Sequence, residues 1–535
     1  MDSALWGPDI SAIRTKTLSR PVHSISSVSG PACLKRAVRV LGGPVTDGDS
    51  TCVKELVRRM ASTSVENKKR VESVKAGSNW IEKWNPEDEH FWENGGKRVA
   101  RRNLVFSIFA EFLGFSVWQL FSIVGALLPF IGFGFNANQV FWLVAIPGLV
   151  GATMRFPYTF AVQKIGGRNW TIISVLLLLI PTLILGFAVM NPATPYWVFV
   201  VSAAAGGFGG GNFSSSMTNI NYFFPNRRKG SALGINAAGG NIGVAIVQLL
   251  VPILTTIGFS IVAIGGSQTK TDPATNATSS VFMQNAAFFW VPLILISAVC
   301  AYFFMNSLHI SQTLAREQAL VLRRKHTWLM SWLYIGTFGS FIGYSASFPA
   351  LITVQFPENI EYAGLAWLGP LVGSLARPFG GWLSDKVGGA RVTFWTFVVM
   401  IAAVIGVLYF LGAGSFPGFL GMFLLLFMMT GIGNGSTYRM IPFIFRTERA
   451  REAEGGDEET QDRLVRQGLK EGATVLGFAG AIAAYGGFII PRAYGSSIEA
   501  TGGPQTALTA FIIFYVTCIA VTYWFYYRRN AEIPC

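Results

Sequence analysis

The stretch VGATMRFPYTF, residues 150–160, places one arginine, Arg155, in an apolar run that extends from about Val140 to Val162. An arginine at mid-bilayer costs roughly 2.5–3.5 kcal/mol on insertion scales, so a buried arginine usually faces a partner or a water-filled cavity. The chain is 51% hydrophobic and only 13% charged over 535 residues, which is too apolar for a soluble protein. The sequence therefore predicts an all-α polytopic membrane protein, and Arg155 needs a partner.

Twelve segments from Asn103 onward are long enough to cross a bilayer core of about 30 Å, which takes about 20 apolar residues per helix. Short polar breaks separate them. The predicted spans are 103–132, 139–163, 170–190, 195–224, 231–257, 284–307, 327–350, 361–383, 391–413, 416–445, 468–493 and 505–528.

The positive charges are distributed unevenly between the two sides of these spans. Lysines and arginines gather in the breaks after the even-numbered spans, as in Arg227, Arg228 and Lys229, whereas the other side shows almost only Lys270 and Arg492. By the positive-inside rule both termini are cytoplasmic and the protein is a multi-pass protein of the cell membrane. The net charge of +14 is mostly this topological signal, so nucleic acid is not expected as a partner.

Residues 1–102 precede the first span and differ from the rest in composition. The first 59 are rich in Ser, Gly, Pro and Arg and are predicted to be disordered; either they form a real tail or the chain starts at Met60. The stretch NWIEKWNPEDEHFWENGGKRVARRN, residues 79–103, mixes Trp80, Trp84 and Trp92 with charge, as an interfacial segment ahead of the first span would. A partner-binding helix is the alternative.

The second half of the chain repeats features of the first at a constant spacing. Arg377, in GPLVGSLARPFGGWLSD, lies as deep in the eighth span as Arg155 lies in the second, and 377 − 155 = 222. Gly211-Asn212 and Gly433-Asn434 share this offset, as do Gly166-Gly167 and Gly388-Gly389. A parallel repeat of this kind places a site near the bilayer midplane between the halves, so both arginines should face one cavity.

The repeat divides the chain into two bundles of six helices. The predicted parts are an extension at 1–102, a first bundle at 103–307, a cytoplasmic linker at 308–326, a second bundle at 327–528 and a cytoplasmic tail at 529–535.

Two kinds of motif carry a resemblance to a known family. GGWLSDKVGGAR, residues 380–391, resembles the loop signature of the major facilitator superfamily, with Gly381, Asp385, Gly388, Gly389 and Arg391 in place. The corresponding first-half loop, QKIGGRNW, lacks the acid. GGGNFSSSMTNINYFFPNRRKGSALGINAAGGNIG (209–243) and GIGNGSTYRMIPFIF (431–445) resemble the two nitrate signatures of the nitrate/nitrite porter family. The resemblance implies the major facilitator fold, with nitrate and nitrite as substrates.

The residue types at the two arginines fit such a substrate. A guanidinium stays charged and presents planar, forked donors, which suit a small planar oxyanion. Structural pairing is the alternative, but Glu111 is the one clear acid within a predicted span and cannot neutralise both Arg155 and Arg377. We therefore expect both arginines to bind substrate. Arg439, near the inner end of the tenth span, is expected to snorkel or gate.

The remaining site residues follow from the resemblance. It implies that Asn241 and Tyr334 donate hydrogen bonds to the anion and that Phe213 and Phe338 sandwich it. Tyr334 and Phe338 are i and i+4 and share one helix face. For each aromatic residue, ordinary core packing is the alternative.

Glycines crowd the spans that carry these motifs. Gly239 and Gly243 form a GxxxG step, which lets helix backbones approach closely. Packing alone explains many of the glycines; in a transporter, smooth faces also let the halves rock past one another. The glycines for which we expect packing or gating are Gly209, Gly210, Gly239, Gly243, Gly433, Gly477 and Gly480.

The mode of coupling can be argued from the shortage of buried acids. Nitrate stays charged, so its entry against an inside-negative potential costs about 2.3 kcal/mol per 100 mV. Proton coupling usually uses intramembrane Asp, Glu or His, and only Glu111 qualifies here as a possible proton carrier. The sequence therefore favours nitrate/nitrite exchange by alternating access, with nitrate/proton symport or nitrite export as alternatives; an ion pair or hydrogen bond is the structural alternative for Glu111.

Other classes of function fit the sequence less well. No cofactor is expected, because the five cysteines have no paired or metal-binding spacing. A membrane enzyme is disfavoured because no nucleophile–base pair appears. A nitrate sensor that does not transport is disfavoured because the inner loops 309–326 and 451–467 are too short for an output domain. We expect a monomeric carrier in nitrate assimilation or anaerobic nitrate respiration.

Overall fold

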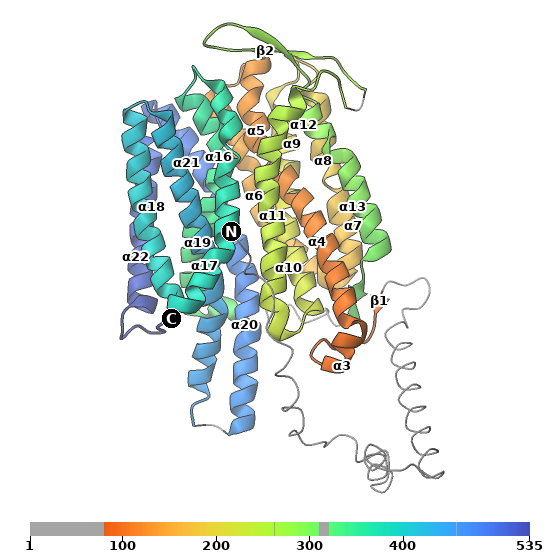
Figure 1. The fold of residues 1–535 in the computed structure, drawn as a ribbon, viewed down its shortest axis with the longest axis vertical. Helices are drawn as coiled ribbons and strands as arrows, with labels where there is room; N and C mark the ends of the chain where they lie inside the picture. The colour runs from red at the N-terminus through yellow and green to blue at the C-terminus, as the bar shows by residue number, and fades with distance from the viewer. Residues whose placement is uncertain (1–79, 262, 310–319, 456) are drawn as a thin grey trace, which may run out of the picture. The chain divides into compact units, whose positions relative to one another are not determined.

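The computed structural model describes residues 80–261, 263–309, 320–455 and 457–535. The predicted tail at 1–59 and the alternative start at Met60 lie outside these residues, as does most of the linker. Within them the chain is almost entirely helical (Figure 1), which confirms the prediction of an all-helical membrane protein.

The first half contains six spans, four of them broken into shorter helices, at Gln119, at Leu177 and Leu178, at Gly207 and at Phe289. The breaks divide a span without ending it. The helices, span by span, are α4 (Lys97–Trp118) with α5 (Leu120–Leu127); α6 (Ala137–Ile165); α7 (Gly167–Leu176) with α8 (Leu179–Ala188); α9 (Tyr196–Gly206) with α10 (Phe208–Phe223); α11 (Asn226–Thr255); and α12 (Asn285–Phe288) with α13 (Trp290–Phe304).

The second half repeats this order. Its first span is α15 (Lys325–Tyr334), a π-helical turn η6 (Ile335–Gly339) and α16 (Ser340–Gln355), after the short η5 (Leu320–Arg323). The others are α17 (Leu368–Val387), preceded by η7 (Ile360–Leu365); α18 (Gly389–Gly412); α19 (Phe416–Glu452); α20 (Glu458–Ala484) with α21 (Gly486–Thr501); and α22 (Gln505–Thr522) with η8 (Tyr523–Tyr527).

Ten helices in the described part of the chain are long and apolar enough to cross a membrane by length and composition. The two predicted spans that are not among them are α9–α10 and α17. Both form helices, but their glycines and polar residues lower their mean hydropathy. These are two of the spans that carry the repeated motifs, so the least apolar helices are those expected at the site.

The internal repeat extends to the loops that follow the second span of each half. Gly166 has a φ of 90° and Gly388 a φ of 96°, conformations that favour glycine. The backbone N–H of Arg168 donates to Ser307 Oγ at 3.2 Å, and that of Ala390 donates to the Cys535 carbonyl at 3.0 Å. Since 390 − 168 = 222, each half closes its loop with the segment that follows its own sixth span.

The two halves are joined at the end of the bundle that carries the hairpin β2 (Gln268–Thr271) and β3 (Thr278–Val281), at the top of Figure 1. There Asn138 Nδ2 donates to Glu499 Oε2 and Arg492 Nη1 donates to Asn138 Oδ1, both at 2.7 Å. Deeper in the bundle, Gln248 Nε2 donates to the Ser345 carbonyl at 2.7 Å. The hydrogen bonds on this side hold the halves together.

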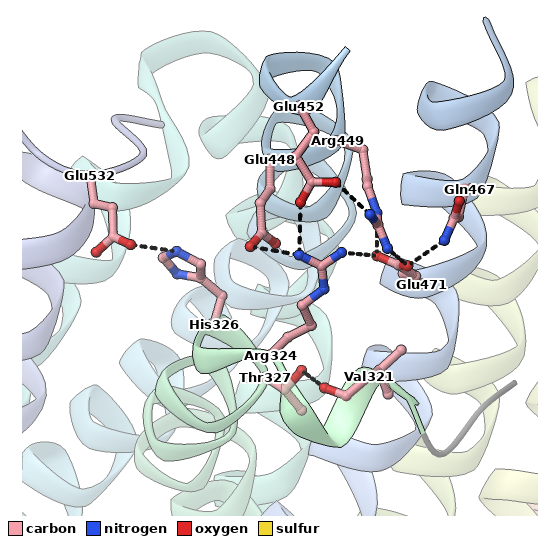
Figure 2. Close-up of polar contacts among 10 residues, drawn as sticks. All are labelled: Val321, Arg324, His326, Thr327, Glu448, Arg449, Glu452, Gln467, Glu471 and Glu532. Atoms are coloured by element: carbon pink, nitrogen blue, oxygen red, sulfur yellow. Dashed lines mark hydrogen bonds and ion pairs between the residues drawn. The ribbon is translucent and has the colours of Figure 1, made fainter. Parts of the chain in front are cut away.

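Helices α19 and α20 extend further than predicted at the opposite end. The 37 residues of α19 rise about 55 Å at 1.5 Å per residue, and α20 reaches below the end of α17 in Figure 1. Figure 2 shows what orders their polar ends: Arg324 contacts Glu452 at 2.9 Å, Glu448 at 3.3 Å and Glu471 at 3.7 Å. The start of the second half is thereby tied to α19 and α20.

His326 and Glu532 form a second contact in the same region, with 3.4 Å between Nε2 and Oε1 (Figure 2). Lys325 Nζ donates to the same carboxylate at 2.6 Å, and this hydrogen bond lowers the pKa of Glu532. The predicted tail at 529–535 therefore contacts the first helix of its own half.

The segment ahead of α4 packs on protein. β1 (Trp80–Ile81) pairs in parallel with β4 (Ser307–Leu308). Trp84 and Trp92 are 5% and 1% exposed, against Phe223 and Phe224 respectively. These two indoles are thus covered by α10 and the turn after it, whereas the composition alone suggested rings at a lipid interface.

Candidate functional site

Arg155 lies in the middle of α6 and is fully buried. Its Nε donates to the Gly210 carbonyl of α10 at 3.1 Å, and its Nη1 donates to the Gly480 carbonyl of α20 at 2.6 Å. Nη2 is buried and has no hydrogen-bond partner among the described residues. The side chain therefore bridges the two halves and keeps one donor group unused.

Three aromatic rings surround the Arg155 guanidinium. Its central carbon lies 4.6 Å from the ring centroid of Phe213, 5.2 Å from Phe338 and 5.4 Å from Trp118. Phe213 and Phe338 come from different halves and stack with their centroids 6.0 Å apart at 24°. Contacts of this kind stabilise a cation that is out of water.

Arg377 of α17 is 6% exposed and differs from Arg155 in its contacts. Its Nη1 is buried without a hydrogen-bond partner, and among the described residues no hydrogen bond or ion pair holds its guanidinium. Its nearest aromatic partner is Tyr438 of α19, at 5.4 Å from the ring centroid. Arg377 interacts electrostatically with both Arg155 and Tyr334, so the two cations share one region.

Tyr334 and Phe338 lie on the same face of the seventh span, with ring centroids 5.5 Å apart at 22°. Phe338 belongs to the π-helical turn η6; such turns occur often at functional sites. The Tyr334 hydroxyl is buried and has no partner in the described part of the chain. A Cβ added to Gly480 would lie within 4 Å of Phe213, Arg155 and Tyr334, so these groups converge on α20.

Asn241 of α11 is 1% exposed, and its Oδ1 has no hydrogen-bond partner among the described residues. No described hydrogen bond links Asn241 to either arginine. Glu111 of α4 is also fully buried, but its hydrogen bonds come from Ser216 and Asn236. The carboxylate therefore pairs directly with neither Arg155 nor Arg377.

The expected glycines fall into two groups by their surroundings. Gly209, Gly210, Gly239, Gly243 and Gly433 pack within their own half, where an added Cβ would approach other heavy atoms to between 2.1 and 2.7 Å. An added Cβ at Gly480 would make only ordinary contacts, and one at Gly477 would meet no atom within 4 Å. The first group explains close helix packing, and the second leaves space beside the site.

The loop signature contains an ion pair between Asp385 and Arg439, both about half exposed. Gly389 packs against Met440 of α19, and a Cβ added to Gly381 would lie 3.9 Å from the Arg439 side chain; Arg391 is exposed. The signature therefore holds α17 to α19 within the second half. Arg439 lies outside the buried cluster around Arg155.

Several residues of the site escaped the sequence analysis. Trp118 follows Glu111 by seven residues and so lies on the same face of α4, a spacing that could have indicated it. Tyr438 directly precedes Arg439. The contact between Gly148 of α6 and Gly487 of α21, where an added Cβ at 148 would lie 2.2 Å from the other backbone, joins two halves and has no local sequence signal.

Two halves that meet around a buried cationic site define a transporter that works between them. The family described as the Major Facilitator Superfamily matches residues 104–453. The fold is similar to a bacterial homolog of the human lysosomal transporter Spinster, with a TM-score of 0.52 and 14% identity, covering 78% of this chain and 95% of the other. It is also similar to the nucleoside transporter NupG, with a TM-score of 0.53 and 11% identity, covering 79% and 99%.

Curated relatives are more similar in sequence. The "Nitrate/nitrite transporter NarU" of Salmonella typhimurium is 46% identical over 457 residues, covering 84% of this chain and 96% of the relative. The "Probable nitrate/nitrite antiporter NarK2" of Thermus thermophilus is 40% identical over 471 residues, covering 86% and 99%. The chain belongs to the nitrate/nitrite porter family of the major facilitator superfamily.

Proposed function

We propose that this chain exchanges nitrate and nitrite across the cell membrane by alternating access, with Arg155 and Arg377 holding the anion. The observation that carries the proposal is a pair of buried guanidinium groups, each with an unpaired Nη group, and neither bonded to a described carboxylate. A buried cation without a counter-ion is costly. A small oxyanion that accepts hydrogen bonds from both groups offsets that cost.

The groups around the arginines support a planar anion as the substrate. The Tyr334 hydroxyl, which has no hydrogen-bond partner among the described residues, supplies one more donor. We assign a further donor role to the Nδ2 group of Asn241. A planar anion between Phe213 and Phe338 needs two van der Waals contacts of about 3.5 Å, whereas the centroids lie 6.0 Å apart. In this proposal the rings separate by about 1 Å to admit the anion.

Exchange follows from the electrostatics of the carrier. If the anion leaves, the guanidinium groups of Arg155 and Arg377 are buried without an anion. The empty carrier then changes between its inward-facing and outward-facing conformations only at a high free-energy cost. A second anion that replaces the first before the halves move avoids this state. Inward movement of nitrate against the potential is then balanced by outward movement of nitrite, without another energy source.

The hydrogen bonds between the halves suggest which side is closed. With both termini placed in the cytoplasm by the positive-inside rule, the contacts around Asn138, Gln248 and the Gly148–Gly487 pair lie on the outer side. We assign this conformation to the inward-facing branch of the cycle. Opening to the outside must break the hydrogen bond from Arg155 to the Gly480 carbonyl. Because a single chain contains both arginines, we take the monomer to be the functional unit.

Counterflow in proteoliposomes tests the proposal. Labelled nitrate should enter vesicles loaded with nitrite or nitrate and should not enter anion-free vesicles when a pH gradient alone is applied. Uptake into anion-free vesicles driven by that gradient would replace obligatory exchange by nitrate/proton symport.

A further inference from the structure

A buried polar cluster lies beside the anion site on three spans of the first half. Glu111 of α4 accepts hydrogen bonds at Oε2 from Ser216 Oγ of α10 and from Asn236 Nδ2 of α11, the latter at 2.5 Å. Asn236 Nδ2 also donates to Ser216 Oγ at 2.8 Å. All three side chains are at most 9% exposed. Both donors serve the same carboxylate oxygen.

The other carboxylate oxygen has no such partner. Glu111 Oε1 is buried without a hydrogen bond in the described part of the chain, and an added Cβ at Gly240 would lie 2.6 Å from it. None of the described ion pairs includes Glu111. An ionised carboxylate here is only half satisfied, and a proton on Oε1 would remove the charge at little steric cost.

The cluster is about one helical turn from the proposed anion site in each span. Phe115 follows Glu111 by four residues and contacts Phe213, with ring centroids 6.1 Å apart. Ser216 follows Phe213 by three residues in α10, and Asn241 follows Asn236 by five in α11. At 1.5 Å per residue these spacings correspond to roughly 5–8 Å along the helix axes.

The charged and titratable groups around Glu111 come from the other spans packed there. Arg155 of α6 and Arg377 of α17 attract its carboxylate, and Tyr438 of α19 also lies within electrostatic range. Charges that share a region from which water is excluded interact strongly. The ionisation of Glu111 therefore depends on whether an anion already neutralises the arginines.

We propose that Glu111, Ser216 and Asn236 form a proton site coupled to anion binding: Glu111 is ionised as an internal counter-ion when the arginines are free, and takes up one proton when nitrate binds. The step adds H⁺ to the carboxylate to give the carboxylic acid, with no other bond changed. This inference rests on the proposed function, since it requires the arginines to bind the anion. It is compatible with exchange for two reasons. Nitrate and nitrite carry the same charge, so each binds together with the same proton. In the empty carrier, Glu111 bonds to neither arginine and the buried Nη groups stay without an acceptor, so reorientation without an anion remains costly.

The coupling has a defined sign. Because anion binding favours protonated Glu111, protonation must favour anion binding by the same factor. Nitrate affinity should therefore rise as the pH falls, by up to about tenfold per pH unit where one full proton is taken up. A purely structural Glu111 gives no proton uptake.

Calorimetric titration of potassium nitrate into the purified full-length carrier, in buffers of different ionisation enthalpy and at several pH values, measures this uptake. The wild type should take up as much as one proton per nitrate, and Glu111→Gln should bind nitrate without proton uptake and without pH dependence. Glu361→Gln, at an exposed acid, is the matched control and should behave as the wild type.

The outcomes separate this inference from the proposed function. Wild-type binding without proton uptake, or unchanged uptake in Glu111→Gln, would overturn the proton site alone. A wild type that does not bind nitrate would refute the proposed function and this inference with it. Ser216→Ala keeps the Glu111 carboxyl group but removes a hydrogen-bond donor to its ionised form. The pH range in which nitrate binding takes up a proton should therefore move up by about one unit; an unchanged pH range would contradict the role of Ser216.

Discussion

Arg155 and Arg377 occupy equivalent positions of the repeat but have different surroundings. Arg155 is fixed by carbonyl groups of Gly210 and Gly480 and lies near three aromatic rings. Among the described residues, Arg377 has no hydrogen bond, and its one cation–π contact is with Tyr438. The repeat therefore supplies two cations, and the packing makes one rigid and leaves the other free to adjust.

The difference suggests a division of labour between the two halves. A guanidinium held by two carbonyls is already oriented, so it loses little entropy when it binds an anion. The freer one can follow the anion as the halves move. Arg155 also bonds to both halves, which makes it part of the closed conformation as well as part of the proposed site.

The largest effect is expected for Arg155→Lys. Lysine keeps the charge but loses the fork that contacts Gly210 and Gly480 while presenting a further donor. With at least two hydrogen bonds of a charged group lost, at about 1.5–3 kcal/mol each, nitrate counterflow should fall at least about a hundredfold. Counterflow within tenfold of the wild type would show that the bridge is dispensable.

Arg377→Lys should weaken nitrate binding without removing a contact between the halves. Loss of one charge-assisted hydrogen bond, about 1.5–3 kcal/mol, corresponds to roughly a tenfold to 150-fold higher half-saturating nitrate concentration in counterflow. Arg439→Lys in the same half is the matched control, because Arg439 pairs with Asp385 away from the site. Equal effects of the two substitutions would remove the special role of Arg377.

Gly148→Ala tests the contact between the halves that does not involve the arginines. An added Cβ would lie 2.2 Å from the Gly487 backbone, which cannot yield as a flexible side chain would. The closed conformation should be destabilised, lowering the counterflow rate about tenfold while nitrate binding is retained. Gly421→Ala, where an added Cβ meets no atom within 4 Å, should leave the rate unchanged.

The smallest effect is expected for Asp385→Asn. The first half has Gln163 at the equivalent position, since 385 − 222 = 163, so this loop works without an acid in one half. An exposed ion pair contributes about 0–1 kcal/mol, so counterflow should change less than about fivefold. A complete loss of counterflow would show that the second half needs the pair between Asp385 and Arg439 to move.

Apolar length indicated the spans, and a constant offset of 222 residues indicated the repeat. The family motifs singled out Arg155, Phe213 and Phe338, which the structure brings together; their binding of an anion stays a prediction. The sequence could not predict that Arg155 bonds to the Gly480 carbonyl, since a backbone carbonyl carries no residue-specific signal. The helices α19 and α20 run beyond the predicted spans 416–445 and 468–493, because they continue as polar helices held by ion pairs such as that of Arg324 with Glu452. The apolar residues of a sequence show which part of a helix crosses the membrane, but they do not show at which residue the helix ends.

The most direct test of the central claim is calorimetric titration of nitrate into the wild type, Arg155→Lys and Arg377→Lys. If both arginines hold one anion, the wild type binds one nitrate per chain and each substitution weakens that same site. Two nitrate sites in the wild type, one of which is lost in each variant, or unchanged affinity in either variant, would contradict a shared anion site.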